Sequence, residues 1–281
     1  RDGIDIHYLE WKPDAESHEP PVVLLHGLSS NARYWERVAR HLPERHIVAL
    51  DQRGHGLTGS AARRPTLRDG FAMRELIRDV HELTGELSLV KPVVAGHSWG
   101  ATVALELVAS QPDLASALVF IDGPVRNVDH MLTWDEAKTL MQPPLPRYPS
   151  MREAIAGSKR DFLEAWDEDL ERFVEARVMR NGPELILTLT APIRLELLRG
   201  LFEARPDDLW PRVHVPAVVM VARRSMARIS RSTDEGIKRL HDVAPLVTVK
   251  RMDSPHDIPL YLPADVASEI VRITTPAGAV G

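Results

Sequence analysis

Residues 93–105 read VVAGHSWGATVAL and join two kinds of local structure at one serine. The first part is an apolar run typical of a buried strand, and the last part has the pattern of a helix. Gly96 to Gly100 match G-x-S-x-G, a pattern in which a sharp strand-to-helix turn exposes the serine hydroxyl. Such a turn strains the serine backbone and brings the two glycine positions together, where side chains would clash. The stretch predicts an exposed hydroxyl at Ser98, although these residues alone also fit a serine that only caps a helix.

Short runs rich in valine and isoleucine alternate with longer amphipathic stretches on both sides of this turn. The predicted strands cover residues 4–11, 21–26, 46–51, 93–95, 117–122, 216–222 and 246–252. The predicted helices cover residues 31–42, 69–89, 101–110, 232–243 and 263–273. This alternation predicts an α/β fold, with a mostly parallel central sheet and helices on both faces.

The alternation stops between Pro124 and Pro211, where the sequence becomes polar, proline-rich and helical. No valine-rich strand interrupts this segment, and residues 185–189, the nearest candidate, suit a helix as well. We therefore expect a core domain of residues 1–123 and 212–281, with residues 124–211 forming a helical cap inserted between two strands.

A histidine-glycine turn follows the first buried strand. In His26-Gly27-Leu28 the tight turn can direct the backbone N–H of Leu28 toward the reaction partner of the serine. The helix that begins near Ser98 directs its first amides, including that of Trp99, to the same place. Together the two N–H groups would form an oxyanion hole, each donor lowering the barrier by about 3 kcal/mol. For the side chain of His26 we expect only a bracing role.

A late histidine has the position required of a general base. His256 lies in the loop between the last predicted strand and the last predicted helix. From there an imidazole can reach the Ser98 hydroxyl, accept its proton and later protonate the leaving group. The sequence contains 12 histidines, and His256 is the one whose place in the chain order fits this role.

The overall composition narrows the possible functions. The 281 residues include 35 basic and 40 acidic side chains, a formal net charge of −5, which gives no support to nucleic-acid binding. Cysteine is absent, which excludes disulfides and a cysteine nucleophile. No apolar run approaches the roughly 20 residues that cross a bilayer. We expect a cytoplasmic protein, while the start at Arg1 without a methionine leaves a cleaved signal peptide open.

With the serine turn, the histidine-glycine loop and the late histidine, the sequence resembles the α/β-hydrolase fold family over residues 4–273. Residues 51–56, Asp-Gln-Arg-Gly-His-Gly, are similar to a characteristic loop of that family. The ending His-Asp-Ile-Pro-Leu, residues 256–260, and the compact cap resemble those of its small-molecule esterases, lactonases and C–C bond hydrolases. The resemblance implies a serine hydrolase for a small ester, thioester or lactone, with no metal or organic cofactor. It also implies a small-molecule substrate, no nucleic-acid or membrane partner, and a monomer or homodimer.

The carboxylate that holds the histidine in this family is missing from its usual place. That place follows the strand at residues 216–222, and the sequence there is Arg-Arg-Ser-Met-Ala-Arg, residues 223–228. Ser225 stands about where the family has its aspartate. An imidazolium needs an anion behind it, and loss of that anion can cost about 10⁴ in rate.

Three aspartates are candidates for the missing acid. Asp122 ends the preceding strand, and some branches of the family place the acid there. The carboxyl end of that strand lies at the same edge of the sheet as the serine. Asp122 is therefore favoured, with a purely structural role in the Gly-Pro turn as its alternative. Asp234 lies far into the next helix, and Asp253 is only three residues before the histidine, so both remain secondary.

Substrate-binding residues are less well defined by the sequence. Leu28 and Trp99 are expected to form pocket walls, because their backbones must face the reacting atom. In the cap, Trp134 is a candidate for the pocket lining, while helix packing explains its spacing equally well. The arginines after residue 222 suit a solvated loop, and binding of a substrate carboxylate is the alternative; they are Arg223, Arg224, Arg228 and Arg231.

Several other functions use the same residues. A C–C bond hydrolase, an amide-cleaving peptidase and a cofactor-free perhydrolase would share the serine and the histidine. Dehalogenases and epoxide hydrolases of this fold use an aspartate nucleophile, so Ser98 argues against both. A non-catalytic binding protein or receptor on the same fold is the alternative outside the enzymes, supported by the missing acid.

Overall fold

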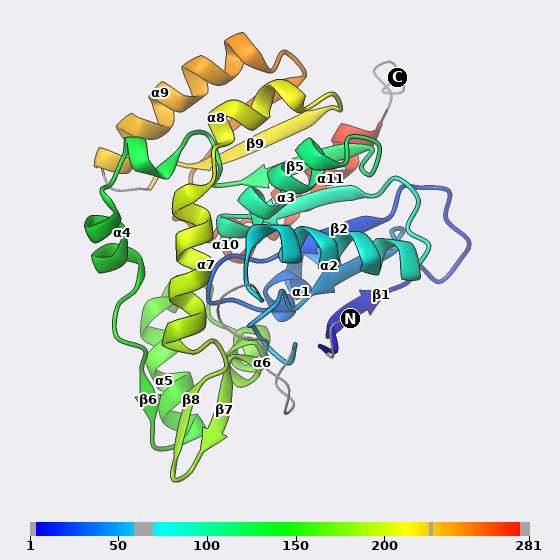
Figure 1. Ribbon diagram of the computed structural model, residues 1–281. Coiled ribbons are helices and arrows are strands. Elements are labelled where there is room, and N and C mark those ends of the chain that lie inside the picture. The colour runs from blue at the N-terminus through cyan, green and yellow to red at the C-terminus, as the bar shows by residue number, and fades with distance from the viewer. Residues whose placement is uncertain (1–3, 59–69, 225–226, 276–281) are drawn as a thin grey trace.

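The computed structural model describes residues 4–58, 70–224 and 227–275. Its main feature is a seven-stranded sheet with the order β1-β3-β2-β4-β5-β9-β10 (Figure 1). Neighbouring strands are parallel except β1, which pairs antiparallel with β3. The strands are β1 (Tyr8–Trp11), β2 (Val22–Leu25), β3 (Ile47–Leu50), β4 (Val93–His97), β5 (Ala117–Ile121), β9 (Ala217–Ala222) and β10 (Val247–Met252).

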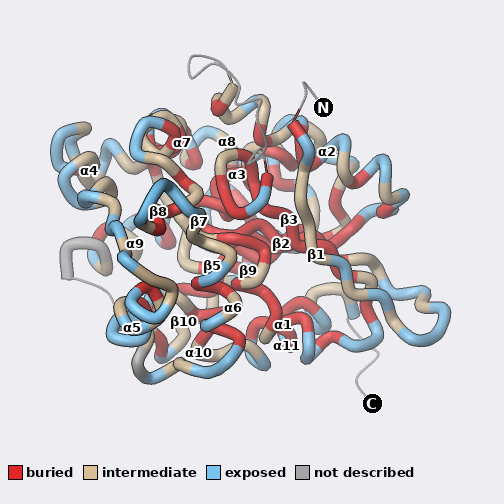
Figure 2. The backbone as a smooth tube through the Cα atoms, turned by 90° about the horizontal axis from the view of Figure 1, so that it is seen from below, coloured by how far each residue is buried: buried red, intermediate tan, exposed pale blue. Residues whose placement is uncertain are grey.

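Both faces of this sheet are covered, which explains the continuous apolar runs of its central strands. Within β2, Val23 and Leu25 pack into one cluster with α2 (Met73–Glu86) and α3 (Trp99–Ser110). The intervening Val22 and Leu24 pack into a second cluster with α1 (Glu36–Ala39) and α11 (Pro263–Thr274). Figure 2 shows the buried strands between these two helical layers. The α/β fold predicted from the sequence is confirmed.

Most of the segment between β5 and β9 lies beside and below the sheet in the view of Figure 1, while α8 lies near the top of the view. Its α-helices are α4 (Trp134–Met141), α5 (Met151–Asp161), α6 (Glu168–Arg177), α7 (Ala191–Glu203) and α8 (Pro206–Leu209). Short 3-10 helices accompany them: η2 (Val128–His130), η3 (Leu163–Ala165) and η4 (Trp210–Arg212). The division into a core and a cap at residues 123 and 212 stays a prediction.

The expectation of a purely helical segment is wrong. A three-stranded antiparallel sheet of order β6-β8-β7 lies within it, formed by β6 (Arg147–Tyr148), β7 (Val178–Asn181) and β8 (Glu184–Leu187). Gly182 joins β7 to β8 with a φ of 60°, a conformation that glycine adopts without steric cost. Asn181 pairs with Glu184, so the two-residue loop is Gly182-Pro183, and glycine at the first loop position is a hairpin signal that outweighs the helical spacing around it.

Three further elements complete the chain: η1 (Ala32–Trp35), α9 (Ala227–Val243) and α10 (Ile258–Tyr261). The start of α9 precedes the predicted start at Ser232. The predicted helix start at Asp69 and the position of Ser225 lie outside the described residues. Within the described ranges, no helix combines the length and the hydropathy needed to cross a bilayer.

Candidate active site

Ser98 lies at the turn between β4 and α3, at the carboxyl edge of the sheet. It has φ 53° and ψ −118°, a strained conformation for a residue with a side chain. A Cβ atom at Gly96 would lie 2.4 Å from the carbonyl oxygen of Gly100, and one at Gly100 would lie 2.4 Å from that of Leu25. Both glycines are therefore required by the sharpness of the turn.

Asp122 follows β5 at the same edge and also has a positive φ, 48°. Its backbone N–H donates to the carbonyl of Met220 at 2.7 Å, and its Oδ1 accepts from the N–H of Ala222 at 2.9 Å. Next to it, a Cβ atom at Gly123 would lie 3.2 Å from the carbonyl oxygen of Ser98, so this turn packs directly against the serine. The ends of β4, β5 and β9 thus hold the carboxylate in a defined orientation.

The remaining carboxylate oxygen of Asp122 meets the late histidine. Oδ2 lies 2.5 Å from Nδ1 of His256, in the loop after β10. Because an ionised carboxylate only accepts hydrogen bonds, Nδ1 carries the proton and donates it. In the neutral ring Nε2 is then unprotonated and can act as a base.

The surroundings of His256 set its pKa. Burial lowers the pKa, while the hydrogen bond and the charge of Asp122, together with the charge of Asp257, raise it. The raising effects are larger, so the pKa of His256 lies above its ordinary value. The side chain of His256 is 51% exposed, so the ring is open to solvent and substrate.

Ser98 and His256 line the same cavity. Among the described residues, no hydrogen bond joins the Ser98 hydroxyl to the His256 ring, so the direct contact expected from the sequence is not formed. The ring of His97, next to the serine in sequence, lies 4.7 Å from the His256 ring between centroids. Catalytic hydrogen bonds are often long before substrate binds and shorten in the complex.

The two expected oxyanion donors have free N–H groups. The backbone N–H groups of Leu28 and Trp99 donate to no acceptor in the described part of the chain. The loop that carries Leu28 also lies against the serine, since a Cβ atom at Gly27 would be 3.4 Å from the Ser98 Cβ. The free N–H of Trp99 is at the N-terminus of α3, where the helix dipole favours negative charge.

Buried histidines brace this loop. His26 accepts a hydrogen bond at Nε2 from the N–H of Gln52 (3.0 Å), and its Nδ1 lies 2.9 Å from the carbonyl of Gly27. His55 accepts at Nε2 from the N–H of Ser29, also at 3.0 Å. Burial lowers the pKa of His26 and lowers that of His55 to about 3, so both rings are neutral. The bracing position expected for His26 matches these contacts.

The loop with sequence Asp-Gln-Arg-Gly-His-Gly, residues 51–56, is held by ionic and backbone contacts. Asp51 accepts hydrogen bonds from the N–H groups of Ala32 (2.7 Å) and Leu57 (2.8 Å). Arg53 donates two hydrogen bonds to the buried carboxylate of Asp79, at 2.6 and 2.7 Å. These bonds fix the loop that carries His55.

A second set of contacts, which the sequence did not indicate, holds the backbone of the His256 loop. His97 donates from Nε2 to the carbonyl of His256 at 3.0 Å. Tyr34 donates to Oδ1 of Asp257 at 3.1 Å, and its ring stacks on that of His97 with 5.0 Å between centroids. Burial is the largest cause that lowers the pKa of His97 to about 3, so this ring stays a neutral donor.

The cavity at this edge has a volume of about 460 Å³. Its lining is mostly apolar and comes from the strand ends, from the segment after Asp122 and from α4, α7 and α9. The lining residues are Ser98, Trp99, Thr102, Asp122, Gly123, Pro124, Val125, Arg126, Val128, Met131, Leu132, Leu140, Met141, Leu201, Pro206, Val221, Arg224, Thr233 and His256. An apolar pocket with a few convergent polar groups is typical of a small-molecule site.

Trp134 and Leu28 are not among the described residues that line this cavity, and their expected role as pocket walls stays a prediction. The Trp134 ring packs against Phe202 of α7, with 5.3 Å between centroids, and so helps to join α4 to α7. Leu28 packs against the larger core cluster, so only its backbone N–H remains relevant. Trp99 does line the cavity.

The other two candidate acids have different partners. Asp253 accepts from Arg224 at 3.1 and 3.4 Å, and Asp234 accepts from Arg251 at 2.5 Å. Neither forms a hydrogen bond to His256 in the described residues. Asp122 is therefore the carboxylate that contacts the histidine.

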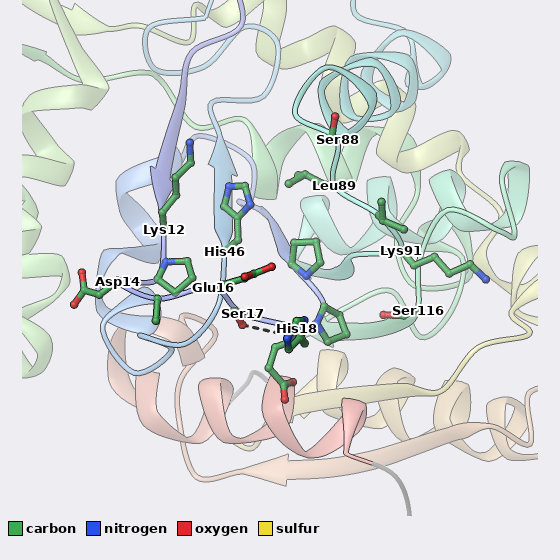
Figure 3. Close-up of a pocket in the computed structure, with 16 residues that line it drawn as sticks. Lys12, Asp14, Glu16, Ser17, His18, His46, Ser88, Leu89, Lys91 and Ser116 are labelled. Carbon is green, nitrogen blue, oxygen red and sulfur yellow. Dashed lines mark hydrogen bonds between the residues drawn. The ribbon is translucent and has the colours of Figure 1, made fainter.

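A second hollow of about 790 Å³ lies at the opposite edge, where the parallel strands begin (Figure 3). Its lining includes Ser17, whose hydroxyl donates to the carbonyl of Glu44 at 2.6 Å, and His46, whose Nε2 lies 2.7 Å from a carboxylate oxygen of Glu10. Among the described residues of that hollow, no hydrogen bond joins a serine to a histidine. No group of three or more acidic or histidine side chains in the described ranges is arranged to bind a metal ion.

Known proteins resemble this chain over much of its length. A family model described as the alpha/beta hydrolase fold matches residues 20–171. A putative non-heme haloperoxidase from Mycobacterium phage D29 is 31% identical over 236 residues, covering 79% of this chain and 81% of that protein. The chain therefore belongs to the α/β-hydrolase fold family.

Two further similarities are more limited. Lipase LipV from Mycobacterium tuberculosis is 35% identical over 122 residues, so the match spans 43% of this chain and 43% of that relative. Among solved structures, E-2-(acetamidomethylene)succinate hydrolase has a TM-score of 0.74 and 20% identity, covering 95% of this chain and 99% of that one. At that level of identity the second likeness shows the fold alone.

Proposed function

We propose that the protein is a serine hydrolase that cleaves a small-molecule ester, thioester or lactone. The main support is the hydrogen bond between His256 and Asp122, formed beside the strained Ser98 in a mostly apolar cavity. Many unrelated functions use this fold, so the proposal rests on these side chains and not on the fold.

In the proposed reaction His256 accepts the proton of the Ser98 hydroxyl through Nε2 as the oxygen attacks the substrate carbonyl. Asp122 keeps the Nδ1 proton in place and stabilises the imidazolium that forms. The N–H groups of Leu28 and Trp99 stabilise the oxyanion. His256 then protonates the leaving group, and water releases the acyl group by the same route.

A serine-reactive fluorophosphonate probe and p-nitrophenyl acetate test this proposal together. We expect labelling and turnover in the wild type, and a fall in turnover of at least about 10⁴-fold with loss of labelling in Ser98→Ala. Ser110→Ala, at the other end of α3, is the matched control and should behave like the wild type. Absence of labelling and of turnover across p-nitrophenyl esters of increasing chain length would exclude the hydrolase and favour a binding protein.

One alternative has specific support, because the putative non-heme haloperoxidase from Mycobacterium phage D29 matches most of this chain. In a perhydrolase the acyl-enzyme on Ser98 would react with hydrogen peroxide and release a peracid in place of a carboxylic acid. Measuring peracid with acetate esters and hydrogen peroxide distinguishes the two outcomes. If peracid formation exceeds hydrolysis at equal nucleophile concentration, perhydrolysis is the better assignment.

A further inference from the structure

The cavity beside Ser98 contains more positive than negative side chains. Arg126 and Arg224 are the cations among its described lining residues, and Asp122 is the acid. Both oxygens of Asp122 are already engaged, one with His256 and one with the N–H of Ala222. A substrate in this cavity therefore meets positive charge that the lining itself does not neutralise.

Arg126 is the more buried of the two arginines, with 11% of its side chain exposed. Its Nη1 donates to a carboxylate oxygen of Glu235 at 2.6 Å and lies 3.4 Å from the carbonyl of Ser232. Its Nε is enclosed and has no acceptor, and its Nη2 has no acceptor in the described part of the chain. A half-buried guanidinium with a donor that has no acceptor is stabilised when a ligand supplies one.

The backbone around Arg126 holds it near the reacting groups. It follows Asp122 by four residues, so the two Cα atoms are at most roughly 14 Å apart. Helix α9 packs tightly on the intervening chain, since a Cβ atom at Gly236 would lie 2.7 Å from the carbonyl oxygen of Val125. The guanidinium therefore lies between α9 and the cavity, within reach of a small substrate.

Arg224 differs from Arg126 in both exposure and pairing. Its side chain is 52% exposed and is already bound by Asp253, with Glu164 at 3.7 Å. Glu235, by contrast, is 65% exposed and contacts only one side of the Arg126 guanidinium. Arg126 is consequently the cavity cation with an Nη2 group that no acceptor in the described residues binds.

We propose that Arg126 binds a carboxylate on the substrate, so that the natural substrate is an anionic ester, thioester or lactone. This inference rests on the proposed hydrolase function and adds the charge of its substrate. The guanidinium presents its donors in a plane that matches a carboxylate, whereas the apolar walls accommodate the carbon chain.

Paired esters test this assignment. The kcat/KM for mono-p-nitrophenyl glutarate, which carries a free carboxylate, is divided by that for neutral p-nitrophenyl butyrate. We expect Arg126→Gln to lower this ratio by about tenfold to a hundredfold, the range for loss of a hydrogen bond between charged groups. Arg126→Lys, which keeps the charge, should restore part of the ratio. Arg239→Gln, an exposed arginine of α9 paired with Asp207, is the matched control and should leave the ratio unchanged.

Binding of glutarate gives a second measurement that needs no turnover. We expect glutarate to raise the Tm of the wild type and to protect it from the fluorophosphonate, and to do neither in Arg126→Gln. If the wild type hydrolyses both esters and Arg126→Gln keeps the same ratio, the carboxylate assignment is wrong while the hydrolase stands. If neither ester is hydrolysed and glutarate still binds through Arg126, the hydrolase is wrong and the anion site stands. Absence of both turnover and glutarate binding overturns both.

Discussion

The two ends of the central sheet carry similar residue types in different arrangements. Each end has a serine, a histidine next to a carboxylate, and non-glycine residues with positive φ: Ser98 and Asp122 at the carboxyl end, Ser88 and Lys91 at the amino end. The amino-end hollow is the larger, about 790 against 460 Å³. The arrangement of the side chains, and not the size of the hollow, distinguishes the cavity proposed as the active site.

The direction of the helices explains part of this difference. Helix α3 begins at Trp99, directly after the carboxyl end of β4, and presents its free N–H groups there. At the amino end the helices terminate, α2 at Glu86 and α3 at Ser110, and they present carbonyl oxygens. Helix N-termini favour negative charge and helix C-termini disfavour it, so an oxyanion of the proposed reaction would be stabilised at the first end and repelled at the second.

The largest effect is expected from Asp122→Asn, at the carboxyl end of the sheet. An amide can keep the shape of the side chain but stabilises the wrong tautomer of His256, so kcat should fall by about 10⁴-fold. Asp253→Asn, which removes the partner of Arg224, is the control and should retain near wild-type turnover. Near-normal kcat in Asp122→Asn would show that this carboxylate is not the triad acid.

A pair of glycine variants compares the packing of the two ends. Gly100→Ala should lower the free energy of unfolding by about 3 kcal/mol, because the new Cβ would meet two backbone carbonyl oxygens at 2.4 Å. Gly85→Ala, in α2 near the amino-end hollow, meets nothing within 4 Å and should raise it by about 0.5–1 kcal/mol. Urea unfolding measures both changes. Equal free energies of unfolding for the two variants would contradict the steric requirement for glycine at position 100.

The pH dependence of kcat/KM reports the protonation of His256. Its pKa is raised above the ordinary value of 6.5, and only the neutral ring accepts the Ser98 proton. The rate should therefore fall about tenfold per pH unit below a midpoint that lies above 6.5. In Asp122→Asn the raising influence is lost, so the midpoint of the residual activity should move to lower pH. An unchanged midpoint would mean that a group other than His256 controls the fall of kcat/KM at low pH.

His97→Phe tests the contacts behind the catalytic loop. The change keeps a ring to stack on Tyr34 but removes the donor to the carbonyl of His256, a hydrogen bond worth about 1 kcal/mol. We expect kcat to fall about fivefold with little change in KM. His97→Gln can still reach the carbonyl and should recover much of the rate, which a purely structural role would not predict.

The smallest effect is expected at the amino end. His46 lines the hollow of Figure 3 and contacts Glu10. His46→Ala removes this contact and should leave kcat/KM within about twofold of the wild type. His256→Ala, the matched change at the other end, should abolish turnover. A large loss in His46→Ala would mean that the two ends of the sheet are coupled in a way that their contacts do not indicate.

Sequence patterns were reliable where a short segment defines its own geometry. The seven strands of the main sheet were predicted within a few residues, and the glycines around Ser98 followed from local steric limits. The sheet β6-β8-β7 was missed because β8 is only four residues long and its apolar spacing also suits a helix. The Gly182-Pro183 turn between β7 and β8 was the signal that could have revealed it.

Contacts between distant residues could not be predicted in the same way. Tyr34 and Asp257 are separated by 223 positions, and nothing in either local sequence indicates the hydrogen bond between them. The cavity lining shows the same limit, since Trp134 lies outside it while Arg126 lies within it. The sequence drew attention to the arginines that follow β9, of which Arg224 lines the cavity, and not to Arg126, the less exposed arginine, which follows β5.

The sequence by itself determined the parallel α/β architecture and the exposed serine turn, because both depend on residue spacing and on steric limits over a few positions. Only the tertiary structure decided which aspartate faces His256 and that Arg126 lines the cavity together with Arg224. Those choices depend on how strand ends, loops and α9 converge from separate parts of the chain, and a carboxylate or a guanidinium acquires its partner only after the elements have packed.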